Sequence, residues 1–277
     1  MSQILIPHLQ PERQFIEIPF SPEQTYSEIK AGILKYAKDT NFTGPAILGL
    51  SGGVDSALVV ALTSLALGRD RVKVFKMPYG KLGADAIRYA DLVIQAFHTP
   101  AENVYTVNVK PAVDAAAKQL GWREDEPNAN ILLGNLMARE RMQVLATYAS
   151  RLIGRIFGTE NYTEHLLAYF TPWGDSASHV EPIRRLYKTQ VWQLALALGV
   201  PNKVINRKPT ADLWVNQTDE GELGVPYQYI DQVLYATVDL KMTPKEIAAK
   251  GIPAKVVGAV LERMEDYDFK NHFPTIL

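Results

Sequence analysis

The sequence predicts an α/β protein with a doubly wound, mostly parallel sheet flanked by helices and a helical C-terminal part. Short β-like runs alternate with helical patterns from residue 46 to about residue 160, which is typical of a parallel sheet with helical crossovers. A glycine-rich turn follows the first of these runs, and such turns join strand to helix at the edge where these folds bind ligands. After residue 226 the patterns are helical.

The predicted elements follow one another in a regular order. We assign residues 1–40 to an N-terminal arm and packing helix, and residues 44–200 to the α/β core. The expected strands are residues 46–50, 72–77, 103–109 and 155–158. Helical patterns are expected at residues 26–38, 57–67, 84–97, 129–152 and 188–198, near Pro111 and within residues 159–164.

The second half of the chain contains a polar segment between two helical regions. Residues 206–224 hold an acidic cluster and few apolar side chains, so we interpret them as a lid loop over a binding site. Residues 226–266 are expected to form C-terminal helices separated by proline-containing breaks. Because no internal repeat or low-complexity block divides the chain, we expect one domain over residues 1–277.

Composition excludes several classes of function. The chain has 277 residues, 47 % of them hydrophobic, and a formal net charge of −1, so no basic field favours nucleic acid. It contains no cysteine, which excludes disulfides, thiolate metal sites and a cysteine nucleophile in this chain. The five histidines show no metal-ligand spacing. Without a signal-like start or an apolar run of membrane-spanning length, we expect a soluble cytoplasmic protein with no membrane partner.

The turn Ser51-Gly52-Gly53-Val54-Asp55-Ser56 carries the strongest functional signal. It lies between an apolar run and a helical pattern, so its backbone N–H groups and the helix N-terminus are expected to face one spot, as phosphate binding requires. The glycines let the backbone approach a ligand, and Asp55 supplies a carboxylate that can hold a metal between phosphates. The alternative is a tight connection in which Ser56 caps the helix. The order of the residues favours phosphate.

This turn resembles the loop of the pyrophosphatase-loop ATP enzymes, which adenylate a carboxylate or carbonyl group and release pyrophosphate. Further stretches extend the likeness to the ammonia-dependent NAD synthetases, and they are residues 134–142, 158–164, 188–190, 208–213 and 219–224. The resemblance implies an adenine nucleotide alpha hydrolase-like fold. It also implies a reaction in which nicotinate adenine dinucleotide attacks the ATP α-phosphorus through its carboxylate, and ammonia then displaces AMP to give NAD.

The resemblance implies roles for individual residues on the ATP side. It assigns ATP to Ser51, Gly52, Gly53, Val54, Asp55 and Ser56 of the turn and to Thr159, Lys188 and Thr210. It assigns Mg²⁺ to Asp55 and Glu164, and it makes Asp55, Lys188 and Asp175 the catalytic set. Because a carboxylate is already nucleophilic, we expect catalysis to rest on positioning and on neutralising phosphate charge.

The acyl-substrate side departs from the family pattern. The resemblance assigns substrate binding to Arg139, Asp175, His179 and His272. The family usually has a lysine at the position of Pro172, an aspartate at that of His179, and a His-Lys pair that we align with His272-Phe273. These changes remove a flexible cation and a carboxylate, so the charges of the substrate must be held differently. Either another group compensates or the acid is a different one, and the candidate groups are Arg184, Arg185, His179 and Lys270.

Three hypotheses about function therefore stay open. The first is ammonia-dependent NAD synthetase, and the second is a ligase of the same family acting on another carboxylate such as nicotinate mononucleotide. The third is a nucleotide-binding regulatory protein without turnover. Glutamine-using members of the family carry an amidase domain with a cysteine nucleophile, so the resemblance implies free ammonia or a separate amidase. The apolar pattern of residues 129–152 predicts either a homodimer interface or burial within the monomer.

Overall fold

The computed structural model describes residues 15–82, 84–214 and 216–272, so most of the expected arm and Phe273 lie outside the described residues. Within them the chain forms a parallel sheet with the strand order β3-β2-β1-β4. The strands are β1 (Ala46–Gly49), β2 (Val72–Lys76), β3 (Val104–Thr106) and β4 (Arg155–Ile156). The predicted parallel sheet flanked by helices is confirmed.

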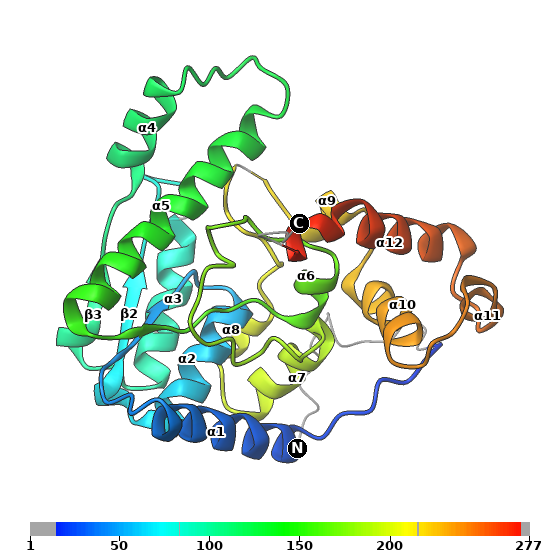
Figure 1. Ribbon diagram of the computed structural model, residues 1–277, viewed down its shortest axis with the longest axis horizontal. Coiled ribbons are helices and arrows are strands. Elements are labelled where there is room, and N and C mark those ends of the chain that lie inside the picture. The colour runs from blue at the N-terminus through cyan, green and yellow to red at the C-terminus, as the bar shows by residue number, and fades with distance from the viewer. Residues whose placement is uncertain (1–14, 83, 215, 273–277) are drawn as a thin grey trace.

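Helices cover both faces of the sheet (Figure 1). Side chains of a strand alternate between faces, so Ala46 and Leu48 join one core while Ile47 joins another. The first core includes side chains of α1 (Pro22–Asp39), α2 (Val54–Leu67), α3 (Ala84–Ala96) and α7 (Lys188–Ala197). The second core joins Ile47 to α5 (Ala129–Leu152). Burial on both faces explains why β1 reads as a continuous apolar run rather than an alternating one.

The remaining helices complete the molecule around this sheet. In the sequence, α4 (Lys110–Gln119) follows β3 and α6 (Tyr162–Leu166) follows β4. The others follow α7, and they are α8 (Asn202–Ile205), α9 (Asp219–Leu223), α10 (Tyr227–Val238), α11 (Pro244–Ala249) and α12 (Ala254–Tyr267). Short 3₁₀ turns occur at Arg69–Arg71, Ala101–Asn103 and Asp268–Asn271. The C-terminal helices α10 to α12 lie at the end of the molecule away from β3 (Figure 1).

The two edge strands are shorter than the sequence predicts. Beyond β4, the chain leaves the sheet because Phe157 bridges to Val180 and the Gly158 N–H donates to the Val180 carbonyl. Beyond β3, the Val107 N–H donates to the carbonyl of Lys76 at the end of β2, and the Val109 N–H donates to the carbonyl of Pro78 after it, outside a regular ladder. Both departures occur at the carboxyl edge of the sheet, where the backbone turns to form the loops of the site.

The long helix α5 is partly buried within the monomer. Met137, Leu145 and Ala149 face the interior, whereas Ile131 and Leu132 near its start are exposed. Among the described residues, no helix has the length and apolar character that a membrane span requires.

Candidate functional site

A cavity of about 610 Å³ lies at the carboxyl edge of the central strands. It is lined by the turn that follows β1, by α5, by the chain after β4 and by the segment 207–214. Ten residues that the sequence assigns to the site share this lining: Ser51, Gly53, Val54, Asp55, Ser56, Thr159, Glu164, Asp175, Lys188 and Thr210. Residues far apart in the sequence thus meet at one cavity, because parallel strands end at the same edge of their sheet.

The turn after β1 leaves the N-terminus of α2 open toward the cavity. The helix begins at Val54, and its N-cap residue Gly53 has no side chain to occupy the first N–H groups. The Ser56 hydroxyl donates to the Gly53 carbonyl (3.0 Å), inside the first helical turn. The hypothesis that Ser56 caps this helix is therefore wrong, since the helix starts two residues earlier. The open N–H groups and the helix dipole favour an anion at this position.

Gly52 is needed for this turn on two grounds. Its φ of +76° lies in the left-handed region, which side chains with a Cβ rarely adopt. A Cβ at this position would also overlap the Ala86 carbonyl oxygen of α3. The turn is therefore held closely against α3, and any larger residue at position 52 would displace it.

Lys188 joins the two candidate metal ligands, Asp55 and Glu164. Its Nζ donates to Asp55 Oδ2 (2.6 Å) and to Glu164 Oε1 (3.2 Å). The Lys188 side chain is 2 % exposed and each carboxylate 17 %, so the three charges meet largely out of water. Although burial favours neutral lysine, the two carboxylates raise the pKa of Lys188 above its usual value, so the ammonium stays charged.

Asn161 fixes the positions of both carboxylates. Its Oδ1 accepts from the Glu164 N–H (3.0 Å), and the Glu164 side chain accepts from the Asn161 N–H, which together form a capping box at the start of α6. Its Nδ2 donates to Asp55 Oδ1 (2.8 Å). One buried amide therefore links the helix start that carries Glu164 to the turn that carries Asp55.

A second buried group connects the elements that carry Glu164 and Lys188. Asp231 of α10 accepts from the Thr163 hydroxyl (2.6 Å) and from the Thr189 N–H (2.7 Å). The Thr163 hydroxyl also accepts from the Lys188 N–H (2.9 Å). Burial raises the pKa of Asp231 to about 6. Thr163, the residue before Glu164, and Thr189, the residue after Lys188, therefore both donate to the carboxylate of Asp231.

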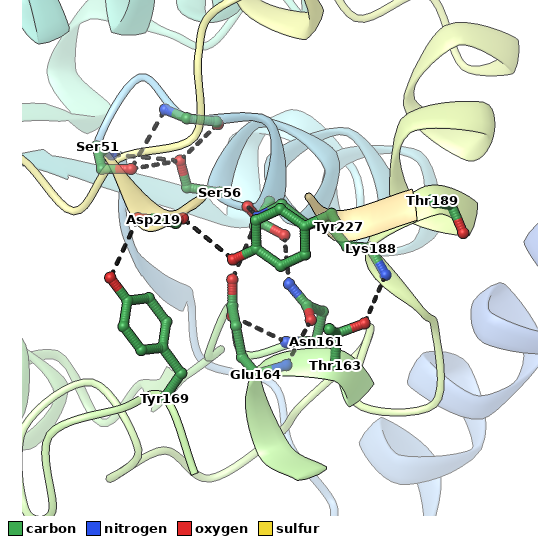
Figure 2. Close-up of polar contacts among 12 residues, drawn as sticks. Ser51, Ser56, Asn161, Thr163, Glu164, Tyr169, Lys188, Thr189, Asp219 and Tyr227 are labelled. Atoms are coloured by element: carbon green, nitrogen blue, oxygen red, sulfur yellow. Dashed lines mark hydrogen bonds and ion pairs between the residues drawn. The ribbon is translucent and has the colours of Figure 1, made fainter. Parts of the chain in front are cut away.

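The expected lid contributes a buried carboxylate rather than a wholly solvated acidic cluster. Asp219, the first residue of α9, is 5 % exposed and lines the cavity. The hydroxyls of Tyr227 (3.2 Å) and Tyr169 (3.4 Å) both donate to it (Figure 2). Burial raises the pKa of Asp219 to about 6, although Lys188 opposes this shift. Two tyrosines therefore anchor this end of the segment at the cavity wall.

The carboxylates of Asp55 and Glu164 suit a divalent cation only with further ligands. Within the described part of the chain, no group of three or more histidine, aspartate or glutamate side chains is arranged to hold a metal by itself. The two carboxylates nevertheless converge on the Lys188 ammonium, which shows that their oxygens point at a common position. Magnesium takes six oxygen ligands and usually keeps waters or phosphate oxygens among them, so these two carboxylates fit a phosphate-bridged Mg²⁺.

Comparison with known proteins identifies the family. A family model described as NAD synthase matches residues 25–274, nearly the whole chain. The chain belongs to the NAD synthase family.

Relatives within this family cover the chain almost end to end. A protein of Fusobacterium nucleatum named NH(3)-dependent NAD(+) synthetase is 37 % identical over 254 residues, which is 92 % of this chain and 95 % of that protein. The solved NH3-dependent NAD synthetase from Campylobacter jejuni is 27 % identical with a TM-score of 0.75, over 93 % of this chain and all of that chain. The solved NMN synthetase from Francisella tularensis is 28 % identical with the same TM-score, over 94 % of this chain and 98 % of that chain.

Three of the expected substrate residues of this NAD synthase family member do not line the cavity. Arg139 donates from Nε to the Pro172 carbonyl (3.3 Å). His179 is exposed, and its Nδ1 accepts from the Ile156 N–H (3.1 Å) at the end of β4. His272 is exposed and pairs through Nε2 with Asp268 Oδ2 (2.9 Å). The structure therefore places none of these three beside Asp55 and Lys188, and their substrate role stays a prediction.

Of the groups that the sequence offers as compensating cations, Lys270 lines the cavity. Its Nζ donates to the carbonyls of Ala168 (3.1 Å) and Phe170 (3.2 Å), and the side chain lines the cavity. Arg184 and Arg185, which the sequence also offered, do not line it. Lys270 lines the cavity whereas His272 does not, and the alignment of the family's His-Lys pair with His272-Phe273 stays a prediction.

Sequence reasoning missed other groups of the site. Arg141, Arg207 and Asp219 line the cavity, while Asn161 and Asp231 hold the residues that do. A signal for Arg141 was present, because it lies on the same helical face as the buried Met137 and Leu145. Nothing in the pattern indicated Asp231, whose role arises from contacts over more than forty residues of sequence.

Asn161 variants separate the capping role from the contact with Asp55. Asn161→Ser keeps a capping oxygen but loses the amide donor, so we expect near-normal stability and about a tenfold loss of kcat. Asn161→Ala loses both, and we expect in addition a loss of about 1 kcal/mol in the free energy of unfolding. Urea unfolding and the rate of AMP formation from ATP measure the two effects. Wild-type kcat in Asn161→Ser would show that Asp55 needs no support from this amide.

A buried cluster around Glu181 is expected to make the stability of the protein depend on pH. Glu181 accepts from the Ser178 hydroxyl (2.6 Å) and from the Glu160 N–H (3.2 Å), and Arg184 donates to Glu160 (2.9 Å). Burial, with the nearby charge of Glu160, raises the pKa of Glu181 to about 7, although Ser178 and Arg184 oppose the shift. The folded protein therefore binds a proton that the unfolded chain has released above about pH 5.

This shift predicts that stability falls as the pH rises toward 8. A raised pKa contributes stability that is fully present below the unfolded value and is lost as the pH passes the folded value. Between pH 5 and pH 8 we expect wild type to lose about 2 kcal/mol relative to Glu181→Gln, which lacks the proton. Urea unfolding of both proteins at the two pH values measures the difference, with Glu262→Gln, an exposed carboxylate, as control. Parallel pH profiles for wild type and Glu181→Gln would contradict the assignment.

Proposed function

We propose that this chain is an ATP-dependent ligase that amidates nicotinate adenine dinucleotide with ammonia, giving NAD, AMP and pyrophosphate. The observation that carries the proposal is the meeting of Lys188, Asp55 and Glu164 beside the open N-terminus of α2. A charged lysine and open backbone N–H groups suit a triphosphate, and the neighbouring cavity has room for a second substrate. The similarity to curated NH(3)-dependent NAD(+) synthetases supports the same reaction.

The chemistry proceeds in two displacements. An oxygen of the nicotinate carboxylate bonds to the α-phosphorus of ATP, the bond from that phosphorus to the bridging oxygen breaks, and pyrophosphate leaves. Ammonia then attacks the acyl carbon, AMP leaves with the carboxylate oxygen, and the new ammonium group loses a proton. Lys188 holds the leaving pyrophosphate by charge. Asp175 is a carboxylate at the same cavity, and its part in the proposal is to accept the proton from the ammonium group.

Mg²⁺ belongs to this proposal as the group that Asp55 and Glu164 would hold. When bound, it would neutralise charge between neighbouring phosphates of ATP. The protein's own part is to keep the two carboxylates converging, through Asn161 and Lys188. Thr210 and Thr159 line the same cavity and are proposed as contacts of the nucleotide.

The acid is tested by direct assay because one solved neighbour is an NMN synthetase. Purified protein is incubated with ATP, MgCl₂ and ammonium chloride, together with either nicotinate adenine dinucleotide or nicotinate mononucleotide. We expect NAD with equal amounts of AMP and pyrophosphate from the first acid, and little product from the second. Amide formation from nicotinate mononucleotide alone would overturn the proposed substrate. Nucleotide binding without AMP release from either acid would favour a regulatory protein.

The same assay tests the source of nitrogen. With glutamine in place of ammonium we expect no amide product, because this chain has no cysteine to act as an amidase nucleophile.

We further propose a homodimer that uses α5, whose exposed Ile131 and Leu132 lie near its start. Sedimentation equilibrium is expected to give twice the chain mass for wild type and a shift toward the monomer for Leu132→Glu. A monomeric wild type would contradict this arrangement.

A further inference from the structure

Arg141 of α5 is a cavity-lining cation to which no role has been assigned above. Its Nε donates to the Met77 carbonyl (3.1 Å), just beyond the end of β2. Within the described part of the chain this is its one hydrogen bond, and no carboxylate forms an ion pair with it. The bond to Met77 fixes the side chain while the remaining N–H donors of the guanidinium stay available at the cavity.

A cation placed in this way is costly without a counter-ion. Loss of hydration lowers the pKa of Arg141, and the charges of Asp212 and Asp175 offset this only from a distance. Removing a charge from water is unfavourable unless it is paired and hydrogen-bonded. An anionic ligand group would supply the missing partner, and the planar fork of arginine suits a phosphoryl group through two parallel hydrogen bonds.

The position of Arg141 selects which phosphoryl group this is. On one side it is bonded to the chain beyond β2, the neighbour of the strand that leads into the phosphate turn. On the other side it shares the cavity lining with Asp212 and with Asp175, the carboxylate assigned to the acyl side, and the charges of both raise its pKa. The β- and γ-phosphates belong with Lys188 at the turn. The α-phosphoryl group is the one that both substrates share during the reaction, so it is the group expected between these two sides.

We propose that Arg141 binds the α-phosphoryl group, first in ATP and then in the acyl-adenylate. This inference rests on the proposed function. As the carboxylate oxygen approaches the α-phosphorus and pyrophosphate departs, negative charge gathers on the oxygens of that phosphorus. A guanidinium already anchored on Met77 meets this charge without moving, so it stabilises the transition state more than it stabilises bound ATP.

Binding of AMP and of adenosine tests the contact without any turnover. The two ligands differ by the phosphoryl group alone, and calorimetry gives the dissociation constant of each. For Arg141→Met we expect about a tenfold to hundredfold weaker AMP affinity and an adenosine affinity within twofold of wild type. Arg141→Lys keeps the charge but loses the fork and is expected to fall between the two. Arg151→Met, an exposed substitution on the same helix, is the matched control and should change neither constant.

The rate of adenylation gives the second readout. Pulse measurements of acyl-adenylate formation are expected to fall about a hundredfold in Arg141→Met, with KM for ATP changed less than kcat and an unfolding temperature close to wild type. The inference is overturned if AMP and adenosine affinities fall together, if neither changes, or if the loss is confined to KM for the acid. Absence of AMP formation by wild type would instead contradict the proposed function, while the comparison of AMP with adenosine would still decide the contact.

Discussion

Replacing Asp55 by alanine is expected to lower kcat for AMP formation by about a thousandfold while leaving the fold intact. Asp55 lies in the first turn of α2, and its carboxylate contacts both Lys188 (2.6 Å) and Asn161 (2.8 Å). Without it the turn has no carboxylate to hold a cation between the phosphates, and Lys188 is left with Glu164 as its one carboxylate partner of this pair. Glu164→Ala is expected to have a similar effect, because the two carboxylates converge on one position.

The measurement compares both single variants with the double variant. If Asp55 and Glu164 act as a unit, the double variant loses little more activity than either single one. Asp70→Ala replaces an exposed carboxylate beyond the far end of α2 and is the control, with circular dichroism to confirm folding. Near-normal turnover in either single variant would refute its place in the site.

Replacing Lys188 by methionine is expected to affect stability and activity together. The methionine fills the buried space, but it leaves Asp55 and Glu164 facing each other without a cation. Removing one partner of a buried ion pair costs about 3–5 kcal/mol, because the charges that remain are uncompensated. We also expect about a thousandfold loss of kcat, since the charge that holds the leaving pyrophosphate is gone.

Added Mg²⁺ separates these two effects. A divalent cation between the carboxylates would take the place of the lysine charge, so MgCl₂ is expected to raise the unfolding temperature of Lys188→Met more than that of wild type. Activity is expected to stay low in both conditions. CaCl₂ at equal ionic strength and NaCl distinguish binding from screening. An unfolding temperature of Lys188→Met equal to that of wild type without metal would contradict a compensating role for this lysine.

The sequence predicted the architecture well because its signals were local. The apolar run at residues 46–50, the glycine turn and the helical pattern beyond it each depend on neighbouring residues, and the structure forms β1 and α2 there. The ends of β3 and β4 were misjudged because they depend on distant partners. Val180, which draws the chain away from β4, lies more than twenty residues later and carries no local signal.

The site was predictable where a residue type and a strand end coincide. Asp55 was predicted from such a position and from the resemblance, Lys188 from the resemblance alone, and the two side chains meet at 2.6 Å. The supporting groups were not, because Asp231 reaches Thr163 and Thr189 only through the packing of α10 on α6 and α7. The sequence did not single out Lys270 among four candidate compensating groups for a related reason. The chain after α12 has no regular pattern, and only its path shows that Lys270 rather than His272 lines the cavity.

The path of one oxygen atom tests the central claim most directly. Nicotinate adenine dinucleotide labelled with ¹⁸O in its carboxylate is converted with ATP and ammonium, and the AMP and pyrophosphate are analysed by mass spectrometry. If the carboxylate attacks the α-phosphorus of ATP whose β- and γ-phosphates lie at the Ser51–Ser56 turn, one ¹⁸O appears in the phosphate of AMP and none in pyrophosphate. Unlabelled AMP, or label in pyrophosphate, would contradict adenylation as the reaction of this site.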